Sequence, residues 1–134
     1  MAKRSLNPEG IAKPVGPYVN VTVAEPGGRL VFCAGAVAFA EDGSIVGAGD
    51  IVAQTRQIMK NLQVALAAAG ATFADVVKIT NYVVDAAEYP KIAPVREEYL
   101  TEPYPASTLV EVKGLLYPEL LIEIDAIAVV HDGG

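Results

Sequence analysis

The chain has few of the residues on which metal sites and disulfides depend. Its 134 residues include one cysteine, Cys33, and one histidine, His131. A single cysteine cannot form a bridge within the chain, which is consistent with a reducing cytosol, and we interpret Cys33 as a small buried apolar residue. His131 lies in a short polar tail, where we expect it to be solvated, and no cluster of histidine and cysteine has zinc-ligand spacing. The sequence therefore predicts no metal site.

Basic clusters and long apolar runs are also missing from the sequence. Ten lysines and arginines against 16 aspartates and glutamates give a net charge of -6, and the basic residues are scattered. Because phosphate binding needs a concentrated basic surface, we expect no nucleic-acid partner, and an affinity for single-stranded RNA no tighter than about 100 μM.

No run approaches the roughly 20 apolar residues that span a bilayer. Residues 1–6 are followed by polar residues and a proline instead of the apolar segment of a signal peptide. We expect a cytoplasmic protein with no membrane partner.

Two common motifs of cofactor binding and catalysis do not occur. The glycines between residues 43 and 49 do not form G-x-G-x-x-G, so we predict no nucleotide cofactor. No serine lies in a G-x-S-x-G context, which argues against a serine hydrolase triad. What the chain does have is apolar residues, 52% of the total. That content is enough for the core of one domain, which we expect to span residues 1–134.

The apolar pattern predicts an α+β protein with both helices on one face of a single sheet. Asp50 is the expected N-cap of the first helix, and Gly70 lies just past its end. Pro94 predicts a late start or a kink in the second helix. The expected elements are a β-hairpin over residues 19–38, a helix over 51–69, a strand over 75–85, a helix over 86–100, and strands over 107–113 and 120–130.

The last predicted strand is apolar on both of its faces. One alternating row holds Leu121, Ile127 and Val129, and the other holds Ile122, Ile124, Ala126 and Val130. A strand that is apolar on both faces is buried on both, whereas helices on one side of the sheet cover only one. We therefore expect another subunit to cover the second face.

Several segments match a known family across nearly the whole chain. They are residues 16–18 (Gly-Pro-Tyr), 30–35 (Leu-Val-Phe-Cys-Ala-Gly), 61–70, 75–78 (Asp-Val-Val-Lys), 105–112 (Pro-Ala-Ser-Thr-Leu-Val-Glu-Val) and 122–128 (Ile-Glu-Ile-Asp-Ala-Ile-Ala). In these segments the chain resembles the Rid (YjgF/YER057c, L-PSP-like) family. The resemblance implies a chorismate-mutase-like α+β fold and a homotrimer that closes around a central β-barrel, with small-molecule sites between subunits.

The resemblance also implies a site, from which this chain departs at three positions. In active members an arginine in a P-A-R-S motif binds the substrate carboxylate through two parallel hydrogen bonds, and Ser107 stands at that position. Ala34 replaces the family's serine, and Ala93 replaces its asparagine. Tyr18 and Glu123 match the family's tyrosine and its water-positioning glutamate, which makes Glu123 the expected catalytic residue. The expected substrate-binding set is Tyr18, Ala34, Gly35, Ala93, Ser107, Thr108 and Leu109.

Three of these residues also have a purely structural interpretation. Ser107 can satisfy backbone groups at the end of a strand, and Tyr18 can pack within its loop. Glu123 can form an ion pair with Lys113 or Lys78 on a neighbouring strand.

Three functions stay open on the sequence. The first is hydrolysis of a reactive imine or enamine with a specificity different from that of arginine-bearing members. The second is ligand binding by a trimer that has lost the chemistry. The third, endoribonuclease activity, is a label that some members carry, and the acidic composition fits it poorly. Because a serine cannot replace an anchoring cation, we expect slow hydrolysis of 2-iminopropionate, a gain of activity on Ser107→Arg, and loss of that gain when Glu123→Ala is added. A rate equal to that of an arginine-bearing member would instead indicate another anchoring cation, such as Arg4, Arg29 or Arg96 of a neighbouring subunit.

Overall fold

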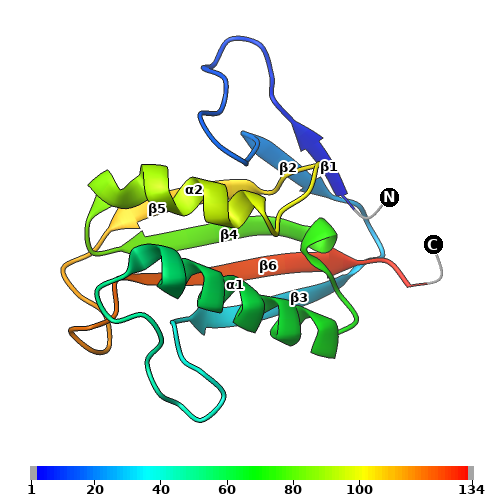
Figure 1. The fold of residues 1–134 in the computed structure, drawn as a ribbon. Coiled ribbons are helices and arrows are strands. Elements are labelled where there is room, and N and C mark those ends of the chain that lie inside the picture. The colour runs from blue at the N-terminus through cyan, green and yellow to red at the C-terminus, as the bar shows by residue number, and fades with distance from the viewer. Residues whose placement is uncertain (1–2, 133–134) are drawn as a thin grey trace.

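Four strands form the central sheet of the protein, in the order β3-β6-β4-β5 (Figure 1). The computed structural model describes residues 3–132. Strand β6 runs antiparallel to β3 and β4, whereas β4 and β5 are parallel. A parallel pair needs a crossover connection, and the chain between β4 and β5 supplies it as a helix. The strands are β3 (Arg29–Ala36), β4 (Val76–Val83), β5 (Ala106–Glu111) and β6 (Ile122–Val130).

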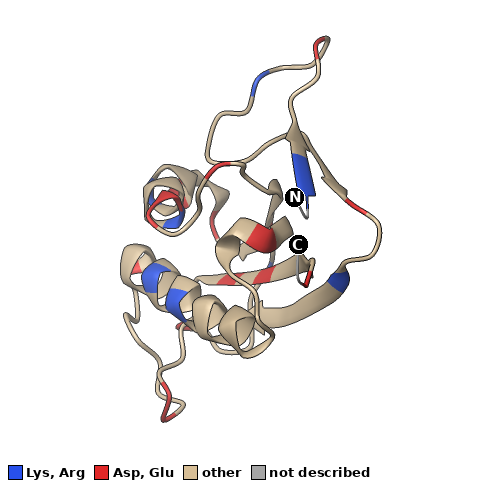
Figure 2. Cartoon of the chain, turned by 90° about the vertical axis from the view of Figure 1, so that its right-hand side faces the viewer, with Lys and Arg blue, Asp and Glu red and all other residues tan. Residues whose placement is uncertain are grey.

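Both helices, α1 (Ile51–Ala68) and α2 (Tyr89–Glu97), cover the same face of this sheet, as the edge-on view in Figure 2 shows. Two short 3-10 helices, η1 (Phe73–Asp75) and η2 (Ala86–Glu88), flank β4. The core lies between the helices and the sheet, and Cys33 is half-buried against it. The predicted α+β class and the placement of both helices on one face are confirmed. Fully buried core residues include Ile58, Met59, Leu66, Ile79, Ile92, Ile122 and Ile124.

The first helix begins and ends where the sequence predicts. The Asp50 side chain accepts a hydrogen bond from the Ala53 backbone N–H at 3.1 Å, which satisfies one of the free donors of the first turn. Gly70 follows the C-cap with a φ of +77°, a left-handed conformation that favours glycine. The second helix starts at Tyr89, after η2, with Pro90 in its first turn. Pro94 lies inside this helix, so the late start that would place Pro94 in the first turn is wrong.

The predicted hairpin is wrong in its pairing. Strand β2 (Val21–Ala24) pairs with β1 (Lys3–Leu6) in a separate two-stranded sheet, and β3 pairs with β6 instead. The turn at residues 25–28 lies between β2 and β3, but it redirects the chain from one sheet to the other (Figure 1). Turn residues specify a local reversal, whereas the choice of partner strand depends on distant residues. Next to this turn His131 Nε2 donates to the Pro26 carbonyl at 2.9 Å, so His131 is not simply solvated.

The face of the sheet away from the helices carries exposed apolar side chains. Leu30 and Phe32 of β3 are 59% and 70% exposed. Ile127 lies beside Phe32 on β6 and is half-buried. These residues are where the predicted trimer would bury apolar surface, and the trimer stays a prediction. Within residues 3–132, no helix combines the length and apolar character needed to cross a membrane.

Candidate functional site

A cavity of about 260 Å³ lies where the loop before β2, the start of α2 and strand β5 meet. Three predicted site residues line it, Tyr18 from the loop and Ser107 and Leu109 from β5. Val15 and Tyr89 complete the lining. The structure therefore brings together three side chains that are separated by up to 91 positions in the sequence.

The loop reaches this position through contacts at both of its ends. The Val19 backbone N–H donates to the Pro105 carbonyl at 2.9 Å, directly before β5. At the other end a Cβ on Gly16 would collide with the Tyr89 hydroxyl, so the phenol packs directly on the glycine backbone. The Gly-Pro-Tyr segment that the sequence singled out thus fits against the first residue of α2.

Ser107 faces the helices. In the parallel pairing with β4 it lies beside Ile79, which is fully buried under the helices, and neighbouring residues in a sheet share a face. Its Oγ accepts a hydrogen bond from Asn81 Nδ2 at 3.1 Å and a longer one from Arg96 Nη1 at 3.4 Å. A serine hydroxyl has two acceptor lone pairs and one donor. Both lone pairs are occupied here, so the Ser107 O–H is left to donate.

Arg96 lies at the site, although it is not part of the substrate-binding set expected from the sequence. It is fully buried on α2, and its Nη1 also donates to Asn81 Oδ1 at 2.9 Å. Burial lowers the pKa of Arg96, while the nearby hydroxyls of Tyr89 and Tyr18 raise it. Burial also raises the pKa of Tyr89, which the guanidinium lowers. One signal was available, because Arg96 lies four residues after Ile92 and therefore on the buried side of the predicted helix.

The cation beside Ser107 changes one premise of the sequence interpretation. We expected a carboxylate at this position to meet a hydroxyl without any guanidinium. Arg96 Nη1 lies 3.4 Å from Ser107 Oγ, so that premise is wrong. The rate of hydrolysis itself stays a prediction.

Glu123 lies on the opposite face of the sheet from Ser107. Its neighbours Ile122 and Ile124 are fully buried toward the helices, so Glu123 points away from them. A Cβ on Gly35 would collide with the Glu123 carboxylate, which means that this glycine makes room for it. Gly35 thus lies against Glu123, and the exposed Ala34 precedes it on β3. Within one chain, Glu123 and Ser107 face opposite sides of the sheet.

Two other predicted site residues lie apart from the cavity. Thr108 shares the open face of the sheet, where Lys78 Nζ donates to its Oγ1 at 2.7 Å. The ion pairs among residues 3–132 do not include Glu123, so the proposed pairing with Lys78 or Lys113 is wrong. Ala93 lies on α2 in a second hollow that shares Val15 and Tyr89 with the cavity.

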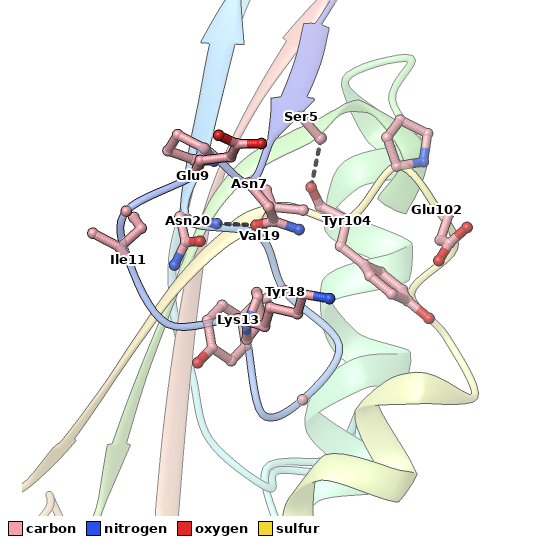
Figure 3. Close-up of a pocket in the computed structure, with 15 residues that line it drawn as sticks. Ser5, Asn7, Glu9, Ile11, Lys13, Tyr18, Val19, Asn20, Glu102 and Tyr104 are labelled. Atoms are coloured by element: carbon pink, nitrogen blue, oxygen red, sulfur yellow. Dashed lines mark hydrogen bonds between the residues drawn. The ribbon is translucent and has the colours of Figure 1, made fainter.

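A larger hollow of about 960 Å³ lies between the N-terminal loop and the segment before β5 (Figure 3). Glu9 and Lys13 lie on its loop side, and Glu102 and Tyr104 lie opposite. Tyr18 is the one predicted site residue that lines it. Because neither Ser107 nor Glu123 borders this hollow, we place the candidate site at the smaller cavity. Among residues 3–132 no three His, Cys, Asp or Glu side chains gather to hold a metal ion.

The fold places the chain among α+β proteins in which two helices cover one face of a mixed four-stranded sheet. The sequence profile of the family described as Endoribonuclease L-PSP matches residues 10–130. A relative named 3-aminoacrylate deaminase RutC, from Acinetobacter baylyi, is 37% identical over 128 residues, which cover 96% of this chain and 98% of the relative. A RutC family protein of Pyrococcus abyssi is 40% identical over 129 residues, with 96% and 98% coverage.

A solved structure of similar shape is the Rid family protein YyfB of Yersinia pestis, whose function is described as unknown. It superimposes with a TM-score of 0.86 at 36% sequence identity, over 97% of this chain and 100% of that chain. The chain belongs to the Rid family, also known as YjgF/YER057c or L-PSP.

Proposed function

We propose that the protein hydrolyses a small imine or enamine acid to a carbonyl compound and ammonia. The observation that carries this proposal is the cavity in which Tyr18, a residue that the chain shares with active members of the family, lies beside Ser107. The relative named 3-aminoacrylate deaminase supports the same reaction class. Water adds to the imine carbon, and the resulting carbinolamine loses ammonia. An enamine enters the same route after a proton moves to carbon.

The water-activating group in this proposal is Glu123 of a neighbouring subunit. Ser107 and Glu123 face opposite sides of one sheet, so a complete site needs two copies of the chain. The exposed Phe32 and Leu30 support such an assembly, because they lie on the face that carries Glu123. The absence of a side chain on Gly35 leaves room for the Glu123 carboxylate on this face, and a general base has to lie within hydrogen-bond reach of the water it activates.

The test measures hydrolysis of 2-iminopropionate, which an amino-acid oxidase generates in the cuvette, by the decay of imine absorbance. We expect the wild type to accelerate the decay and Glu123→Gln to lower the rate by about a hundredfold or more, the usual contribution of a general acid or base. A parallel assay with 3-aminoacrylate covers the enamine. Decay at the background rate with both substrates would contradict the proposal and leave ligand binding without turnover. Ribonuclease activity has no comparable support, since Figure 2 shows Lys and Arg at separated places along the ribbon.

A further inference from the structure

Arg96 carries a buried positive charge for which the protein offers no counter-ion. Its side chain is fully buried, and the ion pairs among residues 3–132 do not include it. Its Nε and Nη2 atoms are buried without any hydrogen-bond acceptor. A buried charge of this kind is unfavourable unless it is paired and hydrogen-bonded. The arrangement therefore indicates that the acceptor is a ligand.

The unpaired atoms form one edge of the guanidinium. Nη1 is occupied by Asn81 Oδ1 and Ser107 Oγ, which leaves the N–H groups of Nε and Nη2 side by side. A guanidinium offers its donors in a rigid fork, and a carboxylate with two oxygens matches two adjacent donors. The free edge therefore selects a carboxylate over a single-atom acceptor.

The guanidinium lies among the residues that line the cavity. Helical side chains lean toward the N-terminus of their helix, so the Arg96 side chain extends along α2 toward Tyr89. Tyr18 and Tyr89, whose hydroxyls act on Arg96 from nearby, and Ser107 all line the cavity. The Ser107 O–H, left free by its two donors, can donate into the same space.

We propose that Arg96 binds the carboxylate of the substrate, assisted by the Ser107 hydroxyl. The cation has moved from the strand position of arginine-bearing relatives to helix α2, and Asn81 holds both Arg96 and Ser107 in place. The ligand class is a small monocarboxylate. This inference rests on the proposed function for the reaction, but carboxylate binding is measurable without turnover.

The experiment titrates the protein with pyruvate, the product of 2-iminopropionate hydrolysis, and with pyruvamide, which has the same shape without the charge. Calorimetry and NMR shift changes report binding. We expect pyruvate to bind the wild type, pyruvamide to bind much more weakly, and Arg96→Met to weaken pyruvate binding about tenfold to a hundredfold, the loss of one or more charge-assisted hydrogen bonds. Ser107→Ala should weaken it less, because it removes one neutral donor.

The matched control is Arg56→Met. Arg56 is an exposed arginine on α1 that pairs with Glu98 at 2.9 Å, and its removal should leave pyruvate binding unchanged. A second readout separates binding from structure. Without ligand, Arg96→Met should melt at or above the temperature of the wild type, because it removes an uncompensated buried charge. Pyruvate should then raise the melting temperature of the wild type but not that of Arg96→Met.

The outcomes distinguish this inference from the proposed function. Equal pyruvate binding by wild type and Arg96→Met would overturn the carboxylate-binding role of Arg96. Equal binding of pyruvate and pyruvamide, or no pyruvate binding at all, would overturn it as well. Pyruvate binding that depends on Arg96 without imine hydrolysis would retain the inference and reject the proposed function. Imine hydrolysis that is unchanged in Arg96→Met would retain the proposed function and reject the carboxylate-binding role of Arg96.

Discussion

Ser107 and Arg96 together determine the charge at the candidate site. They approach to 3.4 Å between Oγ and Nη1, and Asn81 contacts both. The resemblance to the Rid family implies that an arginine at the position of Ser107 would supply the cation. Here a neutral strand residue lies beside a cationic helix residue, so a substitution at one position has to be judged with the other.

The structure changes what we expect of Ser107→Arg. A second guanidinium would enter a buried site next to Arg96, where like charges repel in a medium of low dielectric constant, and the larger side chain would overpack the site. We now expect this variant to melt below the wild type and to gain no hydrolytic activity. Thermal denaturation and the imine assay measure both.

A double variant of Ser107 and Arg96 serves as the control. Adding Arg96→Met to Ser107→Arg restores a single cation, so the double variant should recover stability and bind pyruvate. If Ser107→Arg alone is as stable as the wild type and more active, the two guanidiniums do not compete for one site.

Gly35 controls the position of the Glu123 carboxylate. A Cβ at residue 35 would collide with that carboxylate, and the flexible glutamate end can move aside at little expense in stability. We therefore expect Gly35→Ala to lower imine hydrolysis by about tenfold to a hundredfold, since a small misplacement of a catalytic group has effects of this size. The melting temperature should change little. Gly114→Ala is the control, because a Cβ there meets nothing within 4 Å.

At the scale of elements, side chains attach the β1–β2 sheet to the rest of the protein. Thr22 Oγ1 donates to the Val77 carbonyl at 2.6 Å, and Ser5 Oγ donates to the Tyr104 carbonyl at 2.7 Å. Lys3 is buried, and its Nζ donates to the Val76 carbonyl at 2.6 Å. The two-stranded sheet and its loop carry Tyr18 to the cavity, so these attachments also position the candidate site.

The buried Lys3 makes the free energy of unfolding depend on pH in the alkaline range. Burial lowers its pKa from 10.5 to about 8, although Asp75 nearby raises it. Between these two values the unfolded chain binds more protons than the folded protein, so the free energy of unfolding rises with pH. Urea unfolding at several pH values from 7 to 10 should show this rise for the wild type relative to Lys3→Met. A constant difference between the two proteins would contradict the lowered pKa.

At the scale of the whole molecule, the open face of the sheet exposes large apolar side chains. Phe32 and Leu30 are more than half exposed, and they lie beside β6, the strand that carries Glu123. We expect the wild type to form a trimer of three 14.0 kDa chains, detected by light scattering coupled to size exclusion. A monomer at micromolar concentration would contradict both the trimer and the intersubunit site.

Substitution on this face should separate assembly from ligand binding. Phe32→Asp places a charge in the proposed apolar interface, and we expect a monomer that has lost hydrolysis but retains Arg96-dependent pyruvate binding. Val64→Asp is the control, since Val64 is equally exposed, at 72%, but lies on α1 on the other side of the molecule. A Phe32→Asp variant that hydrolyses imines at the wild-type rate as a monomer would show that one chain contains the whole site.

The sequence by itself determined the elements whose signals lie within a short window. The first helix has an apolar period, Asp50 as a cap and Gly70 at its end, and the structure has all three. Strands β4 and β6 follow from runs of β-branched and apolar residues. These features depend on hydrogen bonds and steric contacts within a few residues. They can therefore be predicted from a short segment without knowledge of the rest of the chain. Family membership was likewise legible in segments of a few residues each.

Only the tertiary structure decided which strands pair and which side chains meet. The turn at residues 25–28 predicted a hairpin, but β2 pairs with β1 and β3 with β6. The register of β5 and β6 turns Ser107 toward the helices and Glu123 away from them, so two residues expected in one site lie on opposite faces. The sequence does not distinguish Arg96 from the other arginines, whereas packing buries it beside Ser107 without a counter-ion. Pairing, register and burial depend on residues far apart in the sequence, because a one-residue shift of a strand moves every side chain to the other face.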